Sequence, residues 1–328
     1  MPLHKTIARA AIRHAGGLQL IRRLNRNSLR ILMFHRFGPP RPGLRETLER
    51  RCAHLRRFYH PLSLSAAAQA WRAGNPLPPN AVAVTVDDGF RDFYELAYPV
   101  FAAQGIPATV YLVTDFMDGR LWLWPDRLRY AVEHAAVPML EATLPSGERL
   151  KLELATAPDR ERALTALGDA AKRLPDADRR RFLDEIPRLL GASVPDHPPA
   201  DYAPLTWDSA REMAANGIEF GAHTRTHPIL SRVETEAALD EEIAGSKRRI
   251  EQELGRPVLH FCYPNGRPED VGDRAVECVE RSGFETAVVT SQGFNFRGAD
   301  RFRLKRIPAD PSYSDAFFEE YVAGVHAR

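Results

Sequence analysis

Residues 82–90 read Val82-Ala83-Val84-Thr85-Val86-Asp87-Asp88-Gly89-Phe90, and the interpretation of the whole chain depends on this stretch. Its first five residues are small, apolar or β-branched, which is typical of a short buried strand rather than a helix. The strand runs directly into two adjacent carboxylates, and a buried carboxylate is costly unless a partner compensates for its charge. Asp87 and Asp88 therefore either face a metal or a reacting group, or only cap the next helix. The stretch by itself leaves these two interpretations open.

Six further segments have the same short apolar character, and helical patterns separate most of them. They cover residues 29–34, 107–113, 218–222, 258–262, 286–290 and 302–307. Short strands that alternate with helices predict an α/β protein with a parallel sheet or barrel. The polar clusters of the chain follow these strands, and in barrels of this type active sites form at that end.

Residues 118–204 interrupt the alternation and predict an insertion packed beside the main domain. Residues 139–154 alternate around Pro145-Ser146-Gly147, which predicts a hairpin. Residues 158–190 are rich in arginine, aspartate and alanine and predict helix. We therefore expect one domain over residues 29–328 that contains a mixed hairpin and helical insertion.

Residues 1–28 predict a basic amphipathic helix, with an apolar stripe and arginines around the rest of its circumference. The stripe contains Ile7, Ala11, His14, Leu18 and Ile21. One interpretation is a helix that docks on the domain by this stripe, and the other is a helix that lies on an anionic membrane surface. The segment lacks the continuous apolar region of a secretory signal.

The composition excludes several classes of protein. The 328 residues include 45 basic and 43 acidic side chains, a balance that does not favour binding to nucleic acid. Three cysteines without a CxxC pair favour a reducing compartment over a disulfide framework. Apolar runs are far shorter than the ~20 residues of a membrane span. We therefore expect a cytoplasmic protein, with peripheral membrane contact through residues 1–28 as a further expectation.

A histidine pair follows the fourth predicted strand, in the segment His223-Thr224-Arg225-Thr226-His227-Pro228. If this segment forms a helical turn, both imidazoles lie on one face, a spacing that lets two histidines chelate one metal. Asp88 at the end of another strand can supply a third ligand. Two histidines and one carboxylate leave positions open on the metal, as a catalytic site requires. A solvated histidine pair is the alternative, and the Asp-Asp strand end makes it the less favoured one.

The same strand ends offer candidates for acid and base catalysis. A cation in such a site would lower the pKa of water to about 7 and polarise a carbonyl group. Asp87 is the candidate general base. His35, at the end of the first strand, is the candidate acid that protonates a leaving group. The alternative for His35 is a buried histidine with a structural hydrogen bond.

These segments resemble the motifs of the polysaccharide deacetylases of the NodB-homology type (carbohydrate esterase family 4). Thr85-Val86-Asp87-Asp88-Gly89 resembles the family's TFDDG motif, with valine in place of phenylalanine, and residues 223–228 resemble its H-[ST]-x-x-H-P motif. Phe261-Cys262-Tyr263-Pro264-Asn265-Gly266 resembles the third motif. The resemblance covers residues 29–117 and 205–308, and implies a distorted (β/α)7-type barrel.

The resemblance also implies roles for individual residues. Asp87 corresponds to the base, and the ligands of one divalent ion, most commonly zinc, correspond to Asp88, His223 and His227. The backbone N–H at Asn265 corresponds to the donor of the oxyanion hole. The implied substrate is an N-acetylated sugar, either a glycan or a lipid-linked precursor. Tyr263 and Trp207 are candidate substrate contacts, because aromatic faces stack on sugar rings.

Two departures from the family pattern stand out. Cys262 replaces the family's usual arginine, so we expect Arg306 to orient Asp87. The usual late catalytic histidine is absent, but Leu32-Met33-Phe34-His35-Arg36 resembles the early "YHR" segment of a subgroup that includes deacetylases of biofilm exopolysaccharide. This resemblance implies that His35 is the acid.

The departures also leave open a catalytically weakened carbohydrate-binding or scaffolding protein of the same fold. A phosphoesterase is less favoured, because such sites usually hold two metals.

Overall fold

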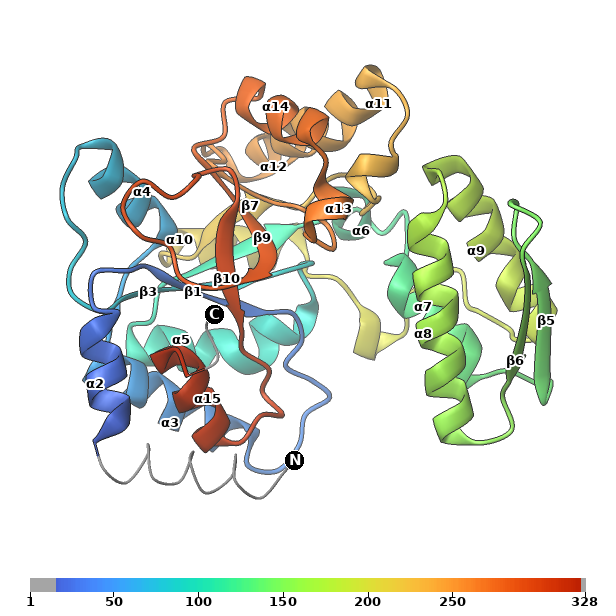
Figure 1. Cartoon of the computed structure of the whole chain (residues 1–328), viewed down its shortest axis with the longest axis horizontal. Coiled ribbons are helices and arrows are strands. Elements are labelled where there is room, and N and C mark those ends of the chain that lie inside the picture. Colours follow the sequence, from blue (N-terminus) through green and yellow to red (C-terminus); the bar gives the residue numbers. More distant parts are fainter. Residues whose placement is uncertain (1–15, 326–328) are drawn as a thin grey trace.

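The computed structural model describes residues 16–325, and its centre is a closed barrel of seven parallel strands (Figure 1). The strands are β1 (Arg30–Phe34), β3 (Ala81–Val86), β4 (Ala108–Leu112), β7 (Glu219–Ala222), β8 (His260–Cys262), β9 (Thr286–Gln292) and β10 (Leu304–Pro308). They lie around the barrel in chain order, and β10 pairs with β1 to close it. This confirms the predicted (β/α)7-type barrel, and each of the seven predicted strands is present.

The barrel is distorted because its strand pairs differ in length. β1 and β3 pair over five positions, from Arg30↔Val82 to Phe34↔Val86, whereas one residue pair, Ala222↔Phe261, registers β7 on β8. The register of β10 on β9 shifts between Leu304 and Arg306. A short strand β2 (His60–Pro61) pairs with the start of β3.

The alternation of β3 divides its side chains between two environments. Val82, Val84 and Val86 belong to the large cluster between the barrel and its helices, whereas Ala81 and Ala83 belong to the smaller cluster that contains Tyr111 and Cys262. Successive side chains of a strand point to opposite faces. All six residues of β3 are buried, which explains the uniform apolar run in the sequence.

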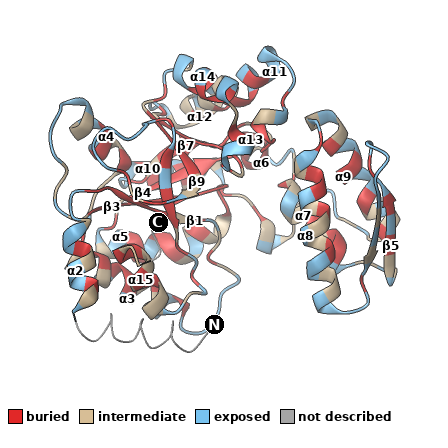
Figure 2. Ribbon diagram, viewed as in Figure 1, coloured by how far each residue is buried: buried red, intermediate tan, exposed pale blue. Residues whose placement is uncertain are grey.

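Helices surround the barrel and turn their buried faces toward it (Figure 2). They are α3 (Leu44–Phe58), α4 (Leu64–Arg72), α5 (Tyr98–Gln104), α6 (Thr114–Met117), α10 (Trp207–Ala215), α11 (Glu236–Asp240), α12 (Ser246–Leu254), α13 (Pro268–Val271), α14 (Asp273–Arg281) and α15 (Asp315–Ala323). Two π-helical segments, η1 (Phe93–Ala97) and η4 (Glu241–Gly245), lead into α5 and α12. Short 3₁₀ turns lie at η2 (Ala200–Tyr202) and η3 (Leu230–Arg232).

The insertion forms a separate lobe beside the barrel, at the right of Figure 1. It contains α7 (Trp124–Glu133), the hairpin β5 (Met139–Thr143) and β6 (Arg149–Glu153), α8 (Ala157–Arg173) and α9 (Asp176–Leu190). A hydrophobic cluster of its own holds these elements together, with Leu128, Leu140, Leu167, Phe182 and Ile186 among its members. The expected mixture of hairpin and helices is present, and the domain boundaries stay predictions.

The predicted amphipathic helix over residues 1–28 lies largely outside the described residues. Its described part is α2 (Gly17–Leu24), which packs near α15. Leu18 and Arg22 are buried, and the Arg22 guanidinium lies 4.4 Å from the centre of the Phe58 ring. Within residues 16–325 no helix has the length and apolar character needed to cross a membrane.

Candidate metal centre and catalytic cavity

The two aspartates leave the end of β3 in different directions because the backbone turns between them. The Asp87 N–H still donates to Phe34 O at 2.9 Å, which continues the pairing with β1. Asp88 then adopts a left-handed φ of 75° and Gly89 one of 82°. A Cβ at position 89 would lie 2.8 Å from Leu112 Cδ2, so the turn requires glycine. The sequence Asp-Asp-Gly therefore sends one carboxylate to each of two partners.

Asp87 forms a buried two-point ion pair with Arg306. Arg306 Nη1 donates to Asp87 Oδ1 at 2.7 Å, and Nη2 donates to Oδ2 at 2.8 Å. Burial by itself raises the pKa of Asp87, but the Arg306 guanidinium reverses this and holds that pKa below its usual value. Arg306 Nη2 also lies 3.3 Å from Cys262 Sγ. The structure therefore brings Arg306 to the carboxylate that we expected it to orient.

The histidine pair lies on a loop, and the expected helical turn is absent. Residues 223–229 follow β7 without regular secondary structure, and Thr224 and His227 have φ values of 68° and 60°. The helical explanation of the spacing is therefore wrong. The loop nevertheless brings the two imidazole centres to 4.9 Å from each other. Left-handed backbone at two positions, not helical periodicity, places His223 beside His227.

Asp88, His223 and His227 converge on one point. The Nε2 atoms of His223 and His227 lie 3.4 Å and 3.5 Å from Asp88 Oδ1. His223 Nδ1 donates to Cys262 O at 2.6 Å, so Nε2 is the ring nitrogen directed at Asp88. Asp88 Oδ1 is buried and has no hydrogen-bond donor among the described residues. A buried oxygen without a donor, facing two imidazole nitrogens, fits a cation between the three residues.

The electrostatics of this group differ between its two histidines. Burial lowers the pKa of His223, but Cys262 and Asp88 reverse this and raise that pKa well above its usual value, so a cation bound there would displace a proton from the ring. Burial lowers the pKa of His227 to about 3, so its imidazole is neutral, which is the form that binds metal. Burial raises the pKa of Asp88, but the neighbouring His223 holds that pKa well below its usual value. Asp87, His223 and Cys262 form a second possible ligand group. We favour the group with Asp88, because Arg306 already occupies both oxygens of Asp87.

His35 lies at the mouth of the site. Its Nε2 is 3.5 Å from Asp87 Oδ2, and 47% of its side chain is exposed. The alternative of a buried structural histidine therefore does not apply. His35 can exchange protons with solvent and still approach the carboxylate of Asp87.

These groups line one cavity of about 450 Å³ between the barrel and the insertion. Its barrel side contains His35, Asp87, Asp88, His223, His227, Tyr263, Asn265 and Thr290, and its insertion side contains Leu123, Pro125, Asp126 and Lys172. Asn265 adopts a φ of 56°, and its carbonyl accepts from Thr290 Oγ1 at 2.6 Å. No described group accepts from the Asn265 backbone N–H. Residues that are distant in sequence thus meet around one opening.

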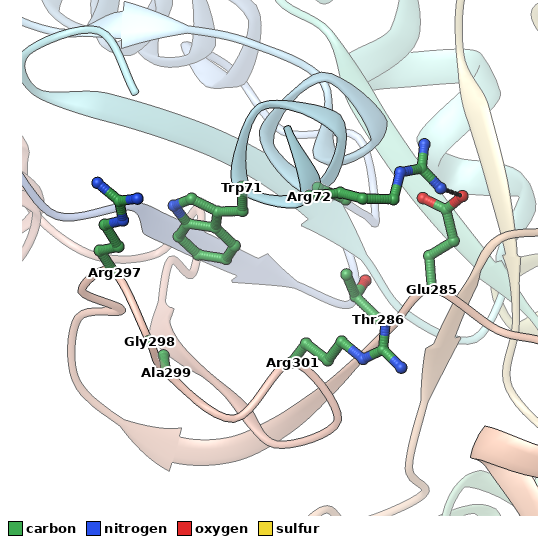
Figure 3. A pocket seen from close by; sticks show the side chains of 9 residues that line it. Trp71, Arg72, Glu285, Thr286, Arg297, Gly298, Ala299 and Arg301 are labelled. Carbon is green, nitrogen blue, oxygen red and sulfur yellow. Dashed lines mark hydrogen bonds and ion pairs between the residues drawn. The ribbon is translucent and has the colours of Figure 1, made fainter. Parts of the chain in front are cut away.

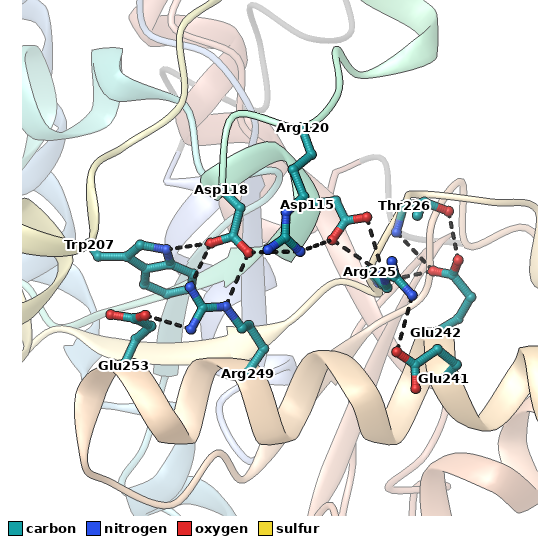
Figure 4. Close-up of polar contacts among 10 residues, drawn as sticks. All are labelled: Asp115, Asp118, Arg120, Trp207, Arg225, Thr226, Glu241, Glu242, Arg249 and Glu253. Atoms are coloured by element: carbon teal, nitrogen blue, oxygen red, sulfur yellow. Dashed lines mark hydrogen bonds and ion pairs between the residues drawn. The ribbon is translucent and has the colours of Figure 1, made fainter.

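The two candidate aromatic contacts differ in position. Tyr263 borders the cavity, but only 1% of it is exposed, and its ring packs on Phe261. Trp207 does not border the cavity. Its indole N–H donates to Asp118 Oδ1 at 2.8 Å, and the Arg249 guanidinium lies over its ring (Figure 4). The expectation that Trp207 contacts substrate therefore finds no support in its position.

Glu242 is a supporting residue that the sequence did not reveal. From η4 it accepts from the backbone N–H groups of Arg225 and Thr226 at 3.0 Å and 2.8 Å, and from Thr226 Oγ1 at 2.6 Å (Figure 4). Glu242 is 7% exposed. It therefore anchors the loop between the two histidines from behind.

Fold and site together define a class: a (β/α)7-type barrel with a carboxylate and two histidines at the C-terminal ends of its strands. Residues 74–137 and 189–287 match the family profile described as polysaccharide deacetylase. The chain belongs to this polysaccharide deacetylase family, as its motifs predicted. The unmatched gap, residues 138–188, falls within the insertion.

Two relatives illustrate how far the similarity extends. YxkH of Bacillus subtilis (strain 168), which carries the family's name, is 27% identical over 121 residues, or 37% of this chain and 42% of that protein. The poly-beta-1,6-N-acetyl-D-glucosamine N-deacetylase of Escherichia coli (strain K12) is 38% identical over 60 residues, or 18% of this chain and 9% of that protein. The chain thus matches less than half the length of these relatives.

Solved structures resemble the fold over most of the chain. The deacetylase PplD of Streptococcus pyogenes, in complex with acetate, has a TM-score of 0.58 and 17% identity, with coverage of 89% of this chain and 96% of that one. IcaB of Ammonifex degensii has a TM-score of 0.56 and 17% identity, with coverage of 90% and 97%. At this identity the comparison shows the shared fold.

Proposed function

We propose that this protein is a divalent-metal-dependent hydrolase that removes N-acetyl groups from an N-acetylated amino sugar or glycan. One observation carries the proposal: the Asp88–His223–His227 group, the Asp87–Arg306 pair and His35 all border the same cavity. The family, and the names of its relatives, support an acetamide as the bond that is cleaved. The early-histidine subgroup and a cytoplasmic location, suggested by three buried free cysteines, are further parts of the proposal.

Asp88, His223 and His227 would hold the cation. When bound, the cation would supply an acidified water and a positive charge beside the acetamide carbonyl. Two imidazole nitrogens and one carboxylate suit zinc, and also suit cobalt, nickel or iron.

Asp87 is the proposed general base. It accepts a proton from the water that attacks the carbonyl carbon. Arg306 binds both oxygens of the carboxylate and so fixes its orientation. Because Arg306 keeps Asp87 ionised in a buried position, the base is ready before substrate arrives.

His35 is the proposed general acid. As the C–N bond of the acetamide breaks, His35 donates a proton to the departing nitrogen, and the products are acetate and the free amino sugar. His35 Nε2 lies 3.5 Å from Asp87 Oδ2 and both residues border the cavity, so both groups could reach the same bound acetamide. The Asn265 N–H, which borders the cavity and donates to no described group, is the proposed second donor to the carbonyl oxygen.

Acetate release from N-acetylglucosamine oligomers tests the proposal. We expect wild-type protein with zinc to release acetate, and chelation or Asp88→Ala to abolish it. Asp208→Ala is a matched control, because this aspartate is 91% exposed on α10 and does not border the cavity. Full activity of Asp88→Ala would rule out the metal assignment. Glycan binding without acetate release, unchanged in His35→Ala, would instead support a carbohydrate-binding or scaffolding protein.

A further inference from the structure

Three large apolar side chains are exposed among the described residues, and they come from only two segments. Leu20 and Leu24 lie one turn apart on α2 and are 59% and 73% exposed. Phe296, in the loop between β9 and β10, is 52% exposed. Exposed apolar side chains that gather on one face of a folded protein mark a surface that contacts a partner or a membrane, whereas scattered ones do not.

Backbone pairing brings the two segments together. Leu29 and Asn295 form an antiparallel bridge, with N–O distances of 2.8 Å and 3.0 Å in the two directions. This bridge places Phe296 beside the residues that connect α2 to β1. The Phe294 ring and the Asn25 side chain also both border Gly324. The end of α2 and the loop at residues 293–301 therefore share one face, which we call the basal surface.

The basal surface lies at the end of the barrel opposite the catalytic cavity. Asn295 pairs just before β1 begins, and Asn80, just before β3, donates to Arg26 O at 2.7 Å. The cavity residues instead follow the C-terminal ends of the strands. In Figure 1, α2 and α4 lie on the left side of the molecule and the insertion lies on the right.

A basic cavity of about 380 Å³ adjoins the loop of the basal surface (Figure 3). Three arginines border it, Arg72, Arg297 and Arg301, together with the indole of Trp71. Glu285 is the one acidic residue of the lining, and it pairs with Arg72. Within residues 16–325 Arg297 has no ion pair, and it directly follows the exposed Phe296 in sequence. Arg301 lies 3.6 Å from Glu280, so Arg297 is the arginine of the lining without an acidic partner among the described residues, and it gives the recess a positive charge beside an exposed aromatic side chain.

The exposed arginines Arg23 and Arg26 add positive charge on the α2 side. Arginines hold lipid phosphates, while leucine and phenylalanine side chains enter the boundary between headgroups and acyl chains. A polyanion in solution would use the arginines but would leave the three apolar side chains in water. The combination of charge and exposed apolar surface therefore favours a bilayer.

We propose that the basal surface docks on an anionic lipid bilayer. Leu20, Leu24 and Phe296 enter the interfacial layer, and the cavity with Arg297 and Arg301 receives a lipid phosphate. In this orientation the catalytic cavity faces the aqueous phase. The docking does not depend on the proposed function, since none of its residues borders the catalytic cavity.

Co-sedimentation of the full chain with vesicles tests this proposal. We expect binding to vesicles of phosphatidylcholine with phosphatidylserine, and about tenfold weaker binding to phosphatidylcholine alone or at high salt. Leu24→Ser combined with Phe296→Ser should weaken binding by about tenfold, because each serine removes an apolar side chain from the interface. Arg297→Glu combined with Arg301→Glu should abolish the preference for phosphatidylserine.

Arg162→Glu combined with Arg188→Glu is the matched control, because both arginines are exposed on the insertion. This variant should bind like wild type. Leu24 and Phe296 are exposed, so the serine variant should keep the wild-type melting temperature, which separates lost docking from lost folding. Equal sedimentation of wild type with both vesicle types would overturn the proposal. Binding of inorganic phosphate, or of a protein partner, without vesicle binding would overturn it as well.

Discussion

At the scale of the residue, the ionisation and the chemical role of a buried carboxylate depend on its partner. Asp87 stays ionised in a fully buried position because Arg306 satisfies both of its oxygens. Asp88, one residue further, has an oxygen without a donor among the described residues. Two adjacent and chemically identical side chains thus acquire different chemistry, one as a candidate base and the other as a candidate ligand.

Arg306→Met should leave the Asp87 carboxylate buried and unpaired. In the native protein the pKa of Asp87 is lowered, so the ionised carboxylate stabilises the fold. This contribution is present above the pKa of an aspartate in the unfolded chain, about 3.9, and is lost as the pH falls through the pKa of Asp87 in the folded protein. Without Arg306, burial should raise this pKa, and stability should then fall as pH rises. We expect a loss of about 3–5 kcal/mol at pH 8 and a smaller loss at pH 5, measured by urea unfolding. Adding Asp87→Asn to Arg306→Met should recover part of the lost stability. Equal losses of stability at both pH values would contradict this account.

Glu242→Ala should weaken metal binding without touching a ligand. It removes the acceptor of two backbone N–H groups in the loop between the histidines. We expect zinc affinity, measured by calorimetry, to fall by about 10–100-fold, with partial recovery in Glu242→Gln. Glu236→Ala is the control, because Glu236 is 58% exposed and its ion-pair partners, Arg274 and Arg281, lie outside the histidine loop. Equal effects of the two alanine variants would argue against the anchoring role.

The sequence predicted the residues that lie in contiguous motifs, and also Arg306 as the partner of Asp87, but it missed Glu242. Asp87, Asp88, His223 and His227 each occur beside a strand end with a recognisable spacing. Glu242 reaches the loop from a π-helical segment, and nothing in its local sequence distinguishes it from other acidic residues of that helix. Contacts between distant segments depend on packing, which periodicity does not encode.

At the scale of the element, β7 leads into the histidine loop and is closely packed at Gly221. A Cβ at this position would lie 2.5 Å from two atoms of the Tyr111 ring and 2.8 Å from His260 O. Gly221→Ala should therefore destabilise the protein by about 1–3 kcal/mol through overpacking. A Cβ at Gly168 in α8 would meet no atom within 4 Å, so Gly168→Ala should be neutral or stabilise the protein by up to about 1 kcal/mol. Thermal unfolding of both variants measures the difference, and a neutral Gly221→Ala would contradict the packing described.

Helix α7 of the insertion carries Asp126 into the catalytic cavity, where it gives stability a pH dependence. Burial raises the pKa of Asp126 to about 7, against about 3.9 in the unfolded chain. The folded state therefore binds the proton more tightly, so this contribution to stability is full below about pH 4 and is lost as pH rises through 7.

Asp126→Asn mimics the protonated form. In metal-free protein we expect it to be more stable than wild type by about 1–3 kcal/mol at pH 8 and equally stable near pH 4. Asp184 is 67% exposed on α9, so the free energy of unfolding of Asp184→Asn should differ from that of wild type by the same amount at both pH values. An Asp126→Asn effect that does not change with pH would be inconsistent with a raised pKa.

The elements themselves were largely predictable. Buried strands such as β3 are uniform apolar runs, and the turn at Pro145-Ser146-Gly147 does connect β5 to β6. The helical turn expected for residues 223–227 was wrong, because spacing alone does not distinguish a helix from a loop with left-handed residues. The side of the barrel on which the insertion packs, and hence the role of Asp126 in the cavity wall, could not be read from local sequence.

At the scale of the whole molecule, the barrel separates two surfaces. The C-terminal ends of the strands and the insertion enclose the catalytic cavity, while α2 and the loop at residues 293–301 form the basal surface at the other end. Under our two proposals, the protein would dock by one end and act on a glycan at the other. This arrangement favours a glycan in the aqueous phase over a sugar still held at the bilayer.

Acetate release as a function of added zinc tests the central claim most directly. Metal-free protein would be titrated with zinc in the presence of an N-acetylglucosamine oligomer. We predict no acetate without metal, a rise that saturates at one zinc per chain, and no rise in His223→Ala. Acetate release by metal-free protein at the rate of the zinc-loaded form would contradict a single catalytic cation at Asp88, His223 and His227.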